Sequence, residues 1–218
     1  MKYKALLFGS IGTIIETSEI QRRSFNNAFK ESGLEWYWDE KDYRNLLQKS
    51  GGIKRIEEFA QKNNTTVDAL KIKSFKTELF NRYLVTESFK PREGVEDVIS
   101  YAKEKGLKLG FVTSTITDNI DAVFVALRDF FHKDNFDFIG NNNLINKPKP
   151  NSEIYFKALD FLSLDASECI AIEDTEESAK SALNANIKCV GFPGNFHQQD
   201  SFSQCEMKLN KLDISIFN

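Results

Sequence analysis

The stretch ALLFGSIGTIIET, residues 5–17, sets the start of the fold. Its apolar run predicts a buried strand over residues 3–8, and the glycines that follow predict a tight turn. Strand ends of this kind often carry catalytic groups in α/β proteins. Here Ser10 is flanked by Gly9 and Ile11, and neither neighbour has a side chain that can attack, donate a proton or bind a metal. The stretch therefore predicts a sheet whose first turn lacks catalytic side chains.

Beyond residue 90, strand patterns alternate with helix patterns. The alternation predicts a parallel sheet covered on both faces, which is a Rossmann-like three-layer α/β/α core. Helices are predicted over 94–105, 117–131, 151–162 and 175–185, and strands over 107–112, 136–139, 169–172 and 187–192.

Between the first strand and this alternation, the pattern is helical throughout. The predicted helices are 18–32, 39–48, 53–62 and 66–88, and Pro91 closes the block. The first strand belongs by character to the sheet, so the helical block is an insertion after strand one. We expect a core domain of residues 1–15 and 90–218 and an all-helical cap domain of residues 16–89.

Composition excludes several classes of protein. The chain has 218 residues, a net charge of -3 and no basic stripe with interleaved aromatics, so we expect no nucleic-acid partner. We expect no membrane partner, because no apolar run approaches the ~18 residues of a span. The N-terminus shows no signal or transit peptide, and the 3 cysteines are odd in number and far apart. We therefore expect a cytoplasmic monomer, or a stromal one if the source is a photosynthetic eukaryote.

Two groups of residues at the predicted strand ends suit a phosphate. Thr113 and Ser114 offer hydroxyls and backbone N–H groups at a helix start, although the same pair also suits ordinary helix capping. Lys147 lies in the stretch NKPKP, residues 146–150, where the prolines hold the loop extended. A single lysine of this kind can equally be a solvated surface residue.

A third group suits a metal ion. Glu173 and Asp174 follow the strand that ends at Ile172, and adjacent carboxylates there are consistent with a hard-cation site. They also suit the start of a helix, where the macrodipole favours negative charge. Because ligands of open α/β sheets bind at the carboxyl ends of the strands, we expect all three groups to line one crevice, with the helical insertion as a lid.

These motifs together resemble the haloacid dehalogenase superfamily, in the branch with a helical cap after the first strand. Within it, the chain looks most similar to the CbbY-type sugar-bisphosphate phosphatases, neighbours of the β-phosphoglucomutases. The resemblance covers nearly the whole chain. It is carried by the cap stretch 24–60, by KTELFNRYL at 76–84, PREGVEDVI at 91–99, NKPKPNSEIY at 146–155 and AIEDTEESAKSALNANIKCVGF at 171–192.

The resemblance implies a role for each matching residue. Thr113 matches the residue that grips the substrate phosphate, and Lys147 matches the lysine that neutralises phosphate and nucleophile. Glu173 and Asp174 match the acidic pair that helps to hold magnesium. Arg55 matches the cap arginine that contacts the distal phosphate of the substrate.

The departures from the family lie where bonds are made and broken. The family begins D-x-D-G-[TV], in which the first aspartate attacks phosphorus and the second protonates the leaving oxygen. Gly9 and Ile11 stand at these positions. If these two positions face the crevice, strand alternation predicts that Ser10 faces away from it. Mg²⁺ binding is then expected to be weak, with the Ile11 carbonyl as a remaining ligand. Further departures are Glu16, Ser18, Gln21 and Ile53.

Three functions stay open at this point. The chain is a sugar-phosphate-binding or regulatory pseudoenzyme, an active Mg-dependent sugar-phosphate hydrolase with a non-standard mechanism, or a structural protein that interacts with others. Losing a covalent nucleophile costs on the order of 10⁴-fold or more in rate, so the usual phosphatase chemistry is not expected.

Overall fold

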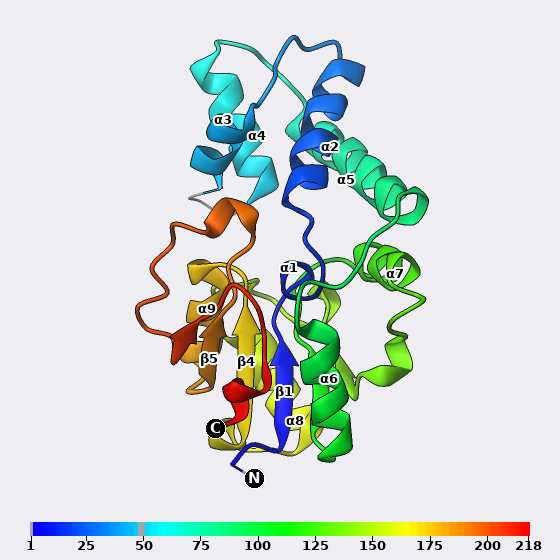
Figure 1. The fold of residues 1–218 in the computed structure, drawn as a ribbon. Coiled ribbons are helices and arrows are strands. Elements are labelled where there is room, and N and C mark those ends of the chain that lie inside the picture. The colour runs from blue at the N-terminus through cyan, green and yellow to red at the C-terminus, as the bar shows by residue number, and fades with distance from the viewer. Residues whose placement is uncertain (1, 48–50) are drawn as a thin grey trace.

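The computed structural model describes residues 2–47 and 51–218. Six parallel strands form one sheet in the order β3-β2-β1-β4-β5-β6 (Figure 1). The strands are β1 (Ala5–Phe8), β2 (Lys108–Phe111), β3 (Phe138–Ile139), β4 (Cys169–Glu173), β5 (Lys188–Gly191) and β6 (Met207–Lys208). From β1, the chain adds strands first on one side, as β2 and β3, and then on the other, as β4, β5 and β6. The switch point therefore lies between β1 and β4, and ligands of such open sheets bind at this kind of switch point.

Strand β1 is central, and this explains its sequence. It pairs with β2 on one side and β4 on the other, with Leu6 opposite Leu109 and Ile170. All four of its residues are buried, because helices cover both faces of the sheet. A strand buried on both faces needs a continuous apolar run rather than alternation.

The two faces of the sheet are covered by different pairs of helices. Side chains of α6 (Val95–Glu104) and α7 (Thr117–Ala126) share one apolar cluster with Leu6 and Phe8. Side chains of α8 (Glu153–Leu162) and α9 (Glu176–Leu183) share the other with Ala5 and Leu7. The predicted three-layer α/β/α core is therefore confirmed.

Four further helices stand beyond the carboxyl ends of the strands (Figure 1). They are α2 (Ser18–Glu31), α3 (Glu40–Leu46), α4 (Gly52–Lys62) and α5 (Ala69–Thr86). Their own apolar cluster is rich in aromatic rings, and the fully buried Trp38 packs edge-on against Phe29 at 4.6 Å between centroids. We call these helices the cap. The cap is all-helical as predicted, and the exact boundaries at 15/16 and 89/90 stay a prediction.

Some elements differ from their predicted bounds. Asp39 and Asp68 accept backbone hydrogen bonds at the starts of α3 and α5, so α5 begins three residues later than its predicted start at residue 66. The end of the predicted helix 39–48, at Gln48, lies outside the described residues. The short helix α1 (Ile11–Ile14) and strand β6 carried no pattern long enough to predict.

Two expectations from composition concern cysteines and membranes. Cys169, Cys189 and Cys205 are all free thiols, as expected from their spacing. Within residues 2–47 and 51–218, no helix combines the length and the apolar character that a membrane crossing requires.

Candidate functional site

A crevice lies between the cap and the carboxyl ends of the strands. It holds two hollows of about 280 Å³ and about 340 Å³, and both are lined by Arg55 of α4, by Thr175 at the start of α9 and by His197. Asp174 lines the smaller hollow, which we call the cap–core pocket. The crevice is therefore at the place where the sheet topology predicts a ligand.

The residues of the turn after β1 do not follow the alternation of side chains that a continued strand would give. The strand ends at Phe8, and Ser10 is the residue that precedes helix α1. Because the backbone turns into this helix, Ile11 points into the apolar core and Ser10 donates its hydroxyl hydrogen to Asp174 at 2.7 Å. Ile11 does not face the crevice, so the condition on which Ser10 was expected to face away from it is not met. The Ile11 carbonyl, expected as a metal ligand, accepts the N–H of Ile15 at 3.0 Å.

The space beside Gly9 is filled by Glu173. A Cβ atom built on Gly9 would lie 2.1 Å from the carboxyl carbon of Glu173. Glu173 is fully buried at the end of β4, and its Oε1 accepts hydrogen bonds from the Tyr155 hydroxyl at 2.7 Å and from Lys149 at 2.5 Å. The glycine thus lets a neighbouring carboxylate occupy the volume in which a side chain at position 9 would begin.

Lys149, and not Lys147, is the lysine at this site. The ammonium of Lys149 also donates to the carbonyl of Gly9, and its side chain is only 8% exposed. Lys147 is exposed, and its backbone N–H donates to Glu153 at 2.9 Å. The expectation that Lys147 points into the crevice was therefore wrong, because the extended stretch of prolines turns the second lysine inward instead.

The pKa values of Glu173 and Tyr155 are shifted in this buried group of side chains. Burial raises the pKa of Glu173, although the ammonium of Lys149 acts in the opposite direction. Burial also raises the pKa of Tyr155 well above its usual value, and the adjacent Glu173 adds to the effect. The Tyr155 hydroxyl therefore stays protonated and acts as a hydrogen-bond donor to Glu173.

The predicted magnesium ligands do not form a suitable donor set. Mg²⁺ prefers about six oxygens in octahedral geometry. Glu173 keeps Oε2 without a hydrogen-bond partner in the described chain, which would suit a cation, but its Oε1 already binds the ammonium of Lys149. Asp174 binds Ser10. No three histidine, cysteine or acidic side chains gather as a metal site among residues 2–47 and 51–218. The residues present do not fit magnesium.

The predicted phosphate grip lies at the end of β2. Thr113 is buried, and its hydroxyl oxygen accepts the N–H of Thr115 at 3.2 Å. Ser114 is half-buried. Helix α7 begins at Thr117, so neither residue is its cap, which is Ile116. The capping interpretation of this pair is therefore wrong, and the phosphate interpretation stays a prediction.

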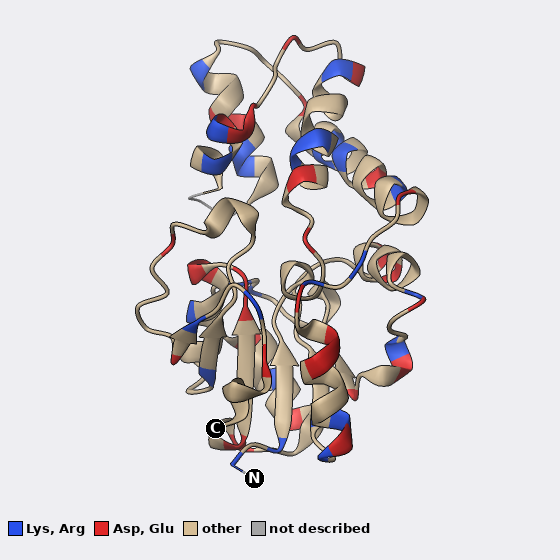
Figure 2. Cartoon of the chain, viewed as in Figure 1, with Lys and Arg blue, Asp and Glu red and all other residues tan. Residues whose placement is uncertain are grey.

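The cap side of the crevice carries three positive side chains. Arg55, Lys73 and Lys76 all line the cap–core pocket. Gly52 makes room for Lys73, because a Cβ atom at residue 52 would lie 2.7 Å from its Cε. Lys76 lies over the Phe80 ring at 4.5 Å and donates to the side-chain oxygen of Gln21. The basic residues of the cap helices are visible in Figure 2.

Burial and mutual repulsion shift these three cations in one direction. Burial lowers the pKa of Lys76 well below its usual value, and the charges of Lys73 and Arg55 lower it further. Burial also lowers the pKa of Lys73, with Arg55 again adding to the effect. Lys73 and Lys76 are three residues apart on α5, a spacing that places them on one face of the helix.

The loop on the core side is held by two charged residues. Arg92 donates to the carbonyls of Gly12 at 2.7 Å and Phe192 at 2.9 Å, which ties the turn after β1 to the end of β5. Glu16 accepts the backbone N–H groups of Ser18 at 2.7 Å and Asn195 at 2.8 Å. Arg92 lies in the stretch PREGVEDVI that carries the family resemblance, but the sequence assigned it no role. The Glu16 carboxylate is occupied by these two backbone N–H groups.

Comparison with known proteins places this arrangement in a family. The sequence profile of the haloacid dehalogenase-like hydrolases matches residues 11–192. The chain belongs to this family. It is 32% identical over 218 residues to a protein CbbY of Rhodobacter capsulatus, which covers 99% of this chain and 96% of the relative.

Two solved structures extend the likeness of this haloacid dehalogenase-like chain to three dimensions. The crystal structure of CbbY from Rhodobacter sphaeroides in complex with phosphate has a TM-score of 0.85 and 30% identity, covering 96% of this chain and 94% of that one. A mutant of the same protein, in complex with xylulose-(1,5)bisphosphate, has a TM-score of 0.86 and 30% identity over the same shares. The predicted family and fold are therefore confirmed, and this chain is a homologue of the CbbY proteins.

Proposed function

We propose that the chain binds a phosphorylated sugar in the cap–core pocket and does not hydrolyse it. The observation that carries the proposal is the gathering of Arg55, Lys73 and Lys76 around one hollow. Such a protein is a pseudoenzyme of the haloacid dehalogenase-like family, with a binding or regulatory role.

The electrostatics of the pocket favour an anion. Burial lowers the pKa of all three cations, and the charge of Arg55 lowers the pKa of both lysines further. A phosphate that enters between them stabilises their charged forms, because an opposite charge nearby favours the charged form. Charge-assisted hydrogen bonds from lysine and arginine to phosphate are about twice as strong as neutral ones. Asp174 lines the same pocket, so a ligand with hydroxyl groups beside its phosphate has an acceptor within the site.

The core side of the crevice lacks the parts for the family's phosphoryl transfer. Gly9 and Ile11 occupy the two positions that the resemblance assigns to the nucleophile and the general acid. Glu173 fills the space beside Gly9 and is fully buried, so it is shielded from a substrate in the crevice. Without an attacking group and a proton donor at these positions, a bound phosphate ester stays intact.

Lys149 supports binding that does not depend on a metal. Its ammonium contacts Glu173 and the Gly9 carbonyl, and it supplies positive charge beside the acidic end of β4. A fixed internal cation neutralises Glu173 in the way that a bound divalent ion does in many phosphate sites. We infer that chelation of divalent metal leaves ligand affinity unchanged.

The relatives indicate which ligands to test first. The CbbY protein of Rhodobacter sphaeroides binds phosphate in one crystal structure and xylulose-(1,5)bisphosphate in another. A bisphosphate suits this crevice, because its additional negative charge meets three positive side chains that line one pocket. Sugar bisphosphates are therefore expected to bind more tightly than sugar monophosphates.

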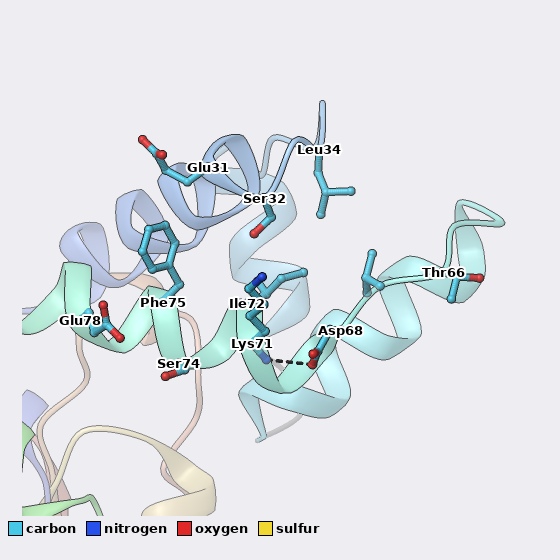
Figure 3. A pocket seen from close by; sticks show the side chains of 11 residues that line it. Glu31, Ser32, Leu34, Thr66, Asp68, Lys71, Ile72, Ser74, Phe75 and Glu78 are labelled. Atoms are coloured by element: carbon cyan, nitrogen blue, oxygen red, sulfur yellow. Dashed lines mark hydrogen bonds between the residues drawn. The ribbon is translucent and has the colours of Figure 1, made fainter.

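Calorimetric titration with sugar mono- and bisphosphates, in buffer containing EDTA, tests the proposal. We expect saturable binding by the wild type. Replacing Lys73 by Met is expected to weaken binding by about tenfold to a hundredfold, which corresponds to a lost charged hydrogen bond of ~1.5–3 kcal/mol. The matched control is Lys71→Ala on the same helix, because Lys71 lines a different groove on the outer side of the cap (Figure 3). No binding across the panel would contradict the proposal.

A second candidate function rests on Ser10. Its hydroxyl donates to the Asp174 carboxylate at 2.7 Å, so Asp174 has the geometry to accept a proton if Ser10 attacks a phosphorus atom. This is the hydrolase with a non-standard mechanism. Release of inorganic phosphate from a sugar bisphosphate, lost in Ser10→Ala and retained in the wild type, would favour it over the pseudoenzyme.

A further inference from the structure

Two of the free cysteines lie together at the edge of the sheet. Cys189 lies on β5, and Cys205 lies two residues before β6. The backbone N–H of Glu206 donates to the Cys189 carbonyl at 2.8 Å, so the two segments are adjacent along their backbones. The side chain of Cys205 packs against the apolar cluster that contains Cys189, and the Cys189 thiol donates to the carbonyl of Val190 at 3.7 Å. Two cysteines on adjacent segments and in one cluster are placed for the approach that a disulfide requires.

The turn before Cys205 holds its thiol in this position. The Cys205 N–H donates to the carbonyl of Phe202 at 2.9 Å. Phe202 is buried with a positive φ of 50°, an unusual conformation for a bulky residue. Its N–H donates to the carboxylate of Glu176 at 2.6 Å, and the Ser201 hydroxyl donates to the same oxygen at 2.7 Å. The surrounding contacts therefore fix the turn and with it Cys205.

Access to the pair is one-sided. Cys205 lines a surface hollow of about 230 Å³ between α9 and the 201–205 segment, and it is half-buried. Cys189 is fully buried. A small oxidant can therefore reach the Cys205 thiol first, because the Cys189 thiol is not exposed to solvent.

We propose that Cys205 and Cys189 form a peroxide-reactive dithiol site that closes to an intramolecular disulfide. The thiolate of Cys205 attacks one oxygen of hydrogen peroxide, which breaks the O–O bond and gives a sulfenic acid; the released hydroxide takes up a proton and leaves as water. The sulfur of Cys189 then attacks the Cys205 sulfur, and the Cys189 proton leaves with the sulfenic hydroxyl as a second water. Two thiols are oxidised by two electrons and one peroxide is reduced.

The acidities of the thiols agree with this order. The neighbouring Cys189 side chain lowers the pKa of Cys205, and this favours the thiolate that attacks peroxide. The same contact, together with burial, raises the pKa of Cys189. Burial raises the pKa of Cys169, on β4, to about 12, so the third cysteine is expected to stay unreactive.

The disulfide would close a loop that reaches the crevice. Residues 189–205 include Phe196, which packs against Tyr43 of the cap at 5.7 Å between ring centroids. They also include His197, which lines the cap–core pocket. Oxidation would restrain the base of a loop that contacts the cap and lines the cap–core pocket.

Thiol counting on the intact, folded chain tests the site. After brief treatment with hydrogen peroxide and denaturation, maleimide labelling is expected to find one free thiol in the wild type instead of 3. Peptide mapping is expected to find the Cys189–Cys205 disulfide, and dithiothreitol is expected to reverse it. The matched control Cys169→Ser is expected to lose both of its remaining thiols. Cys205→Ser is expected to keep both of its thiols.

Two results would overturn the proposal. One is retention of all thiols by the folded wild type at peroxide concentrations that oxidise the unfolded chain. The other is equal thiol loss in Cys205→Ser and Cys169→Ser. The wild-type measurement stands without any variant, so a cysteine replacement that fails to fold does not remove the test. None of these readouts depends on sugar-phosphate binding, so failure here and failure of the proposed function are separate outcomes.

Discussion

At the scale of single residues, Gly9 has no side chain, and the carboxylate of Glu173 lies where its Cβ would stand. Gly9→Ala is therefore expected to destabilise the fold by about 1–3 kcal/mol through overpacking. The same change should cost little when Glu173 is replaced by Ala. A double-mutant cycle by urea denaturation is expected to give a coupling free energy of at least about 1 kcal/mol between these positions.

Additive effects in that cycle would contradict the placement of Glu173. The result also bears on restoring activity. Gly9→Asp with Ile11→Asp would add a carboxylate into the volume that Glu173 fills, beside the single ammonium of Lys149. We expect no phosphatase activity from that double variant unless Glu173 also moves.

Lys76 shows the conflict between stability and binding at one residue. Its side chain is almost fully buried among aromatic rings. A charge buried among apolar groups costs free energy of folding, and a well-packed apolar residue avoids this cost. Lys76→Met is therefore expected to raise the free energy of unfolding and to weaken sugar-phosphate binding. Chemical denaturation and calorimetry on one sample measure both. A less stable variant with unchanged affinity would contradict a binding role for Lys76.

The lowered pKa of Lys76 also predicts a pH dependence. In the free protein the lysine loses its proton at a lower pH than the ordinary value of 10.5. A bound phosphate favours the charged form and raises the pKa, so the protein takes up protons on binding between the two values. Affinity is expected to fall as the pH rises through this window, at a pH above ~7 where the ligand's own charge is constant. Calorimetry in two buffers of different ionisation enthalpy measures the uptake, which Lys76→Met should reduce.

At the scale of secondary-structure elements, the sequence predicts the strands and helices that have a clear hydrophobic periodicity. The core strands and most helices follow from apolar runs and helical spacing, and Asp39 caps α3 at the start of the predicted helix 39–48. The directions in which single side chains point at the site were not predicted from the sequence. Two lysines share the stretch NKPKP, and only the path of the backbone decides that Lys149 faces inward. Likewise, helix α1 begins at Ile11, so the side-chain alternation of strand β1 does not extend to Ser10 and Ile11.

Arg92 joins two elements that are far apart in the sequence. Its guanidinium donates to carbonyls at the end of β5 and in the turn after β1, and it lies over the Phe192 ring at 3.4 Å. Arg92→Ala leaves these buried carbonyls without their donor, so it is expected to cost about 3 kcal/mol of unfolding free energy. Arg92→Lys keeps the charge without the planar fork and should recover only part of that loss. Thermal denaturation distinguishes the two, and equal stability of Arg92→Ala and wild type would contradict the clamp.

At the scale of the whole molecule, the chain combines a familiar fold with an altered site. The sheet, its two helical layers and the inserted cap match the CbbY structures over 96% of the chain. At the switch point of the sheet, Gly9, Glu173 and Lys149 form a buried network. The positive side chains of the cap remain on the opposite wall of the crevice. We propose that sugar-phosphate binding at the cap wall persists in this chain without bond cleavage at the end of β1.

Phosphorus-31 NMR of a sugar bisphosphate mixed with the protein tests this separation most directly, because one spectrum reports binding and hydrolysis together. The wild type is expected to broaden or shift the ester phosphate resonances, in EDTA and in Mg²⁺ alike, with no resonance of inorganic phosphate after prolonged incubation. Sharp, unshifted ester resonances would contradict binding. Growth of an inorganic phosphate resonance would contradict the loss of phosphatase chemistry.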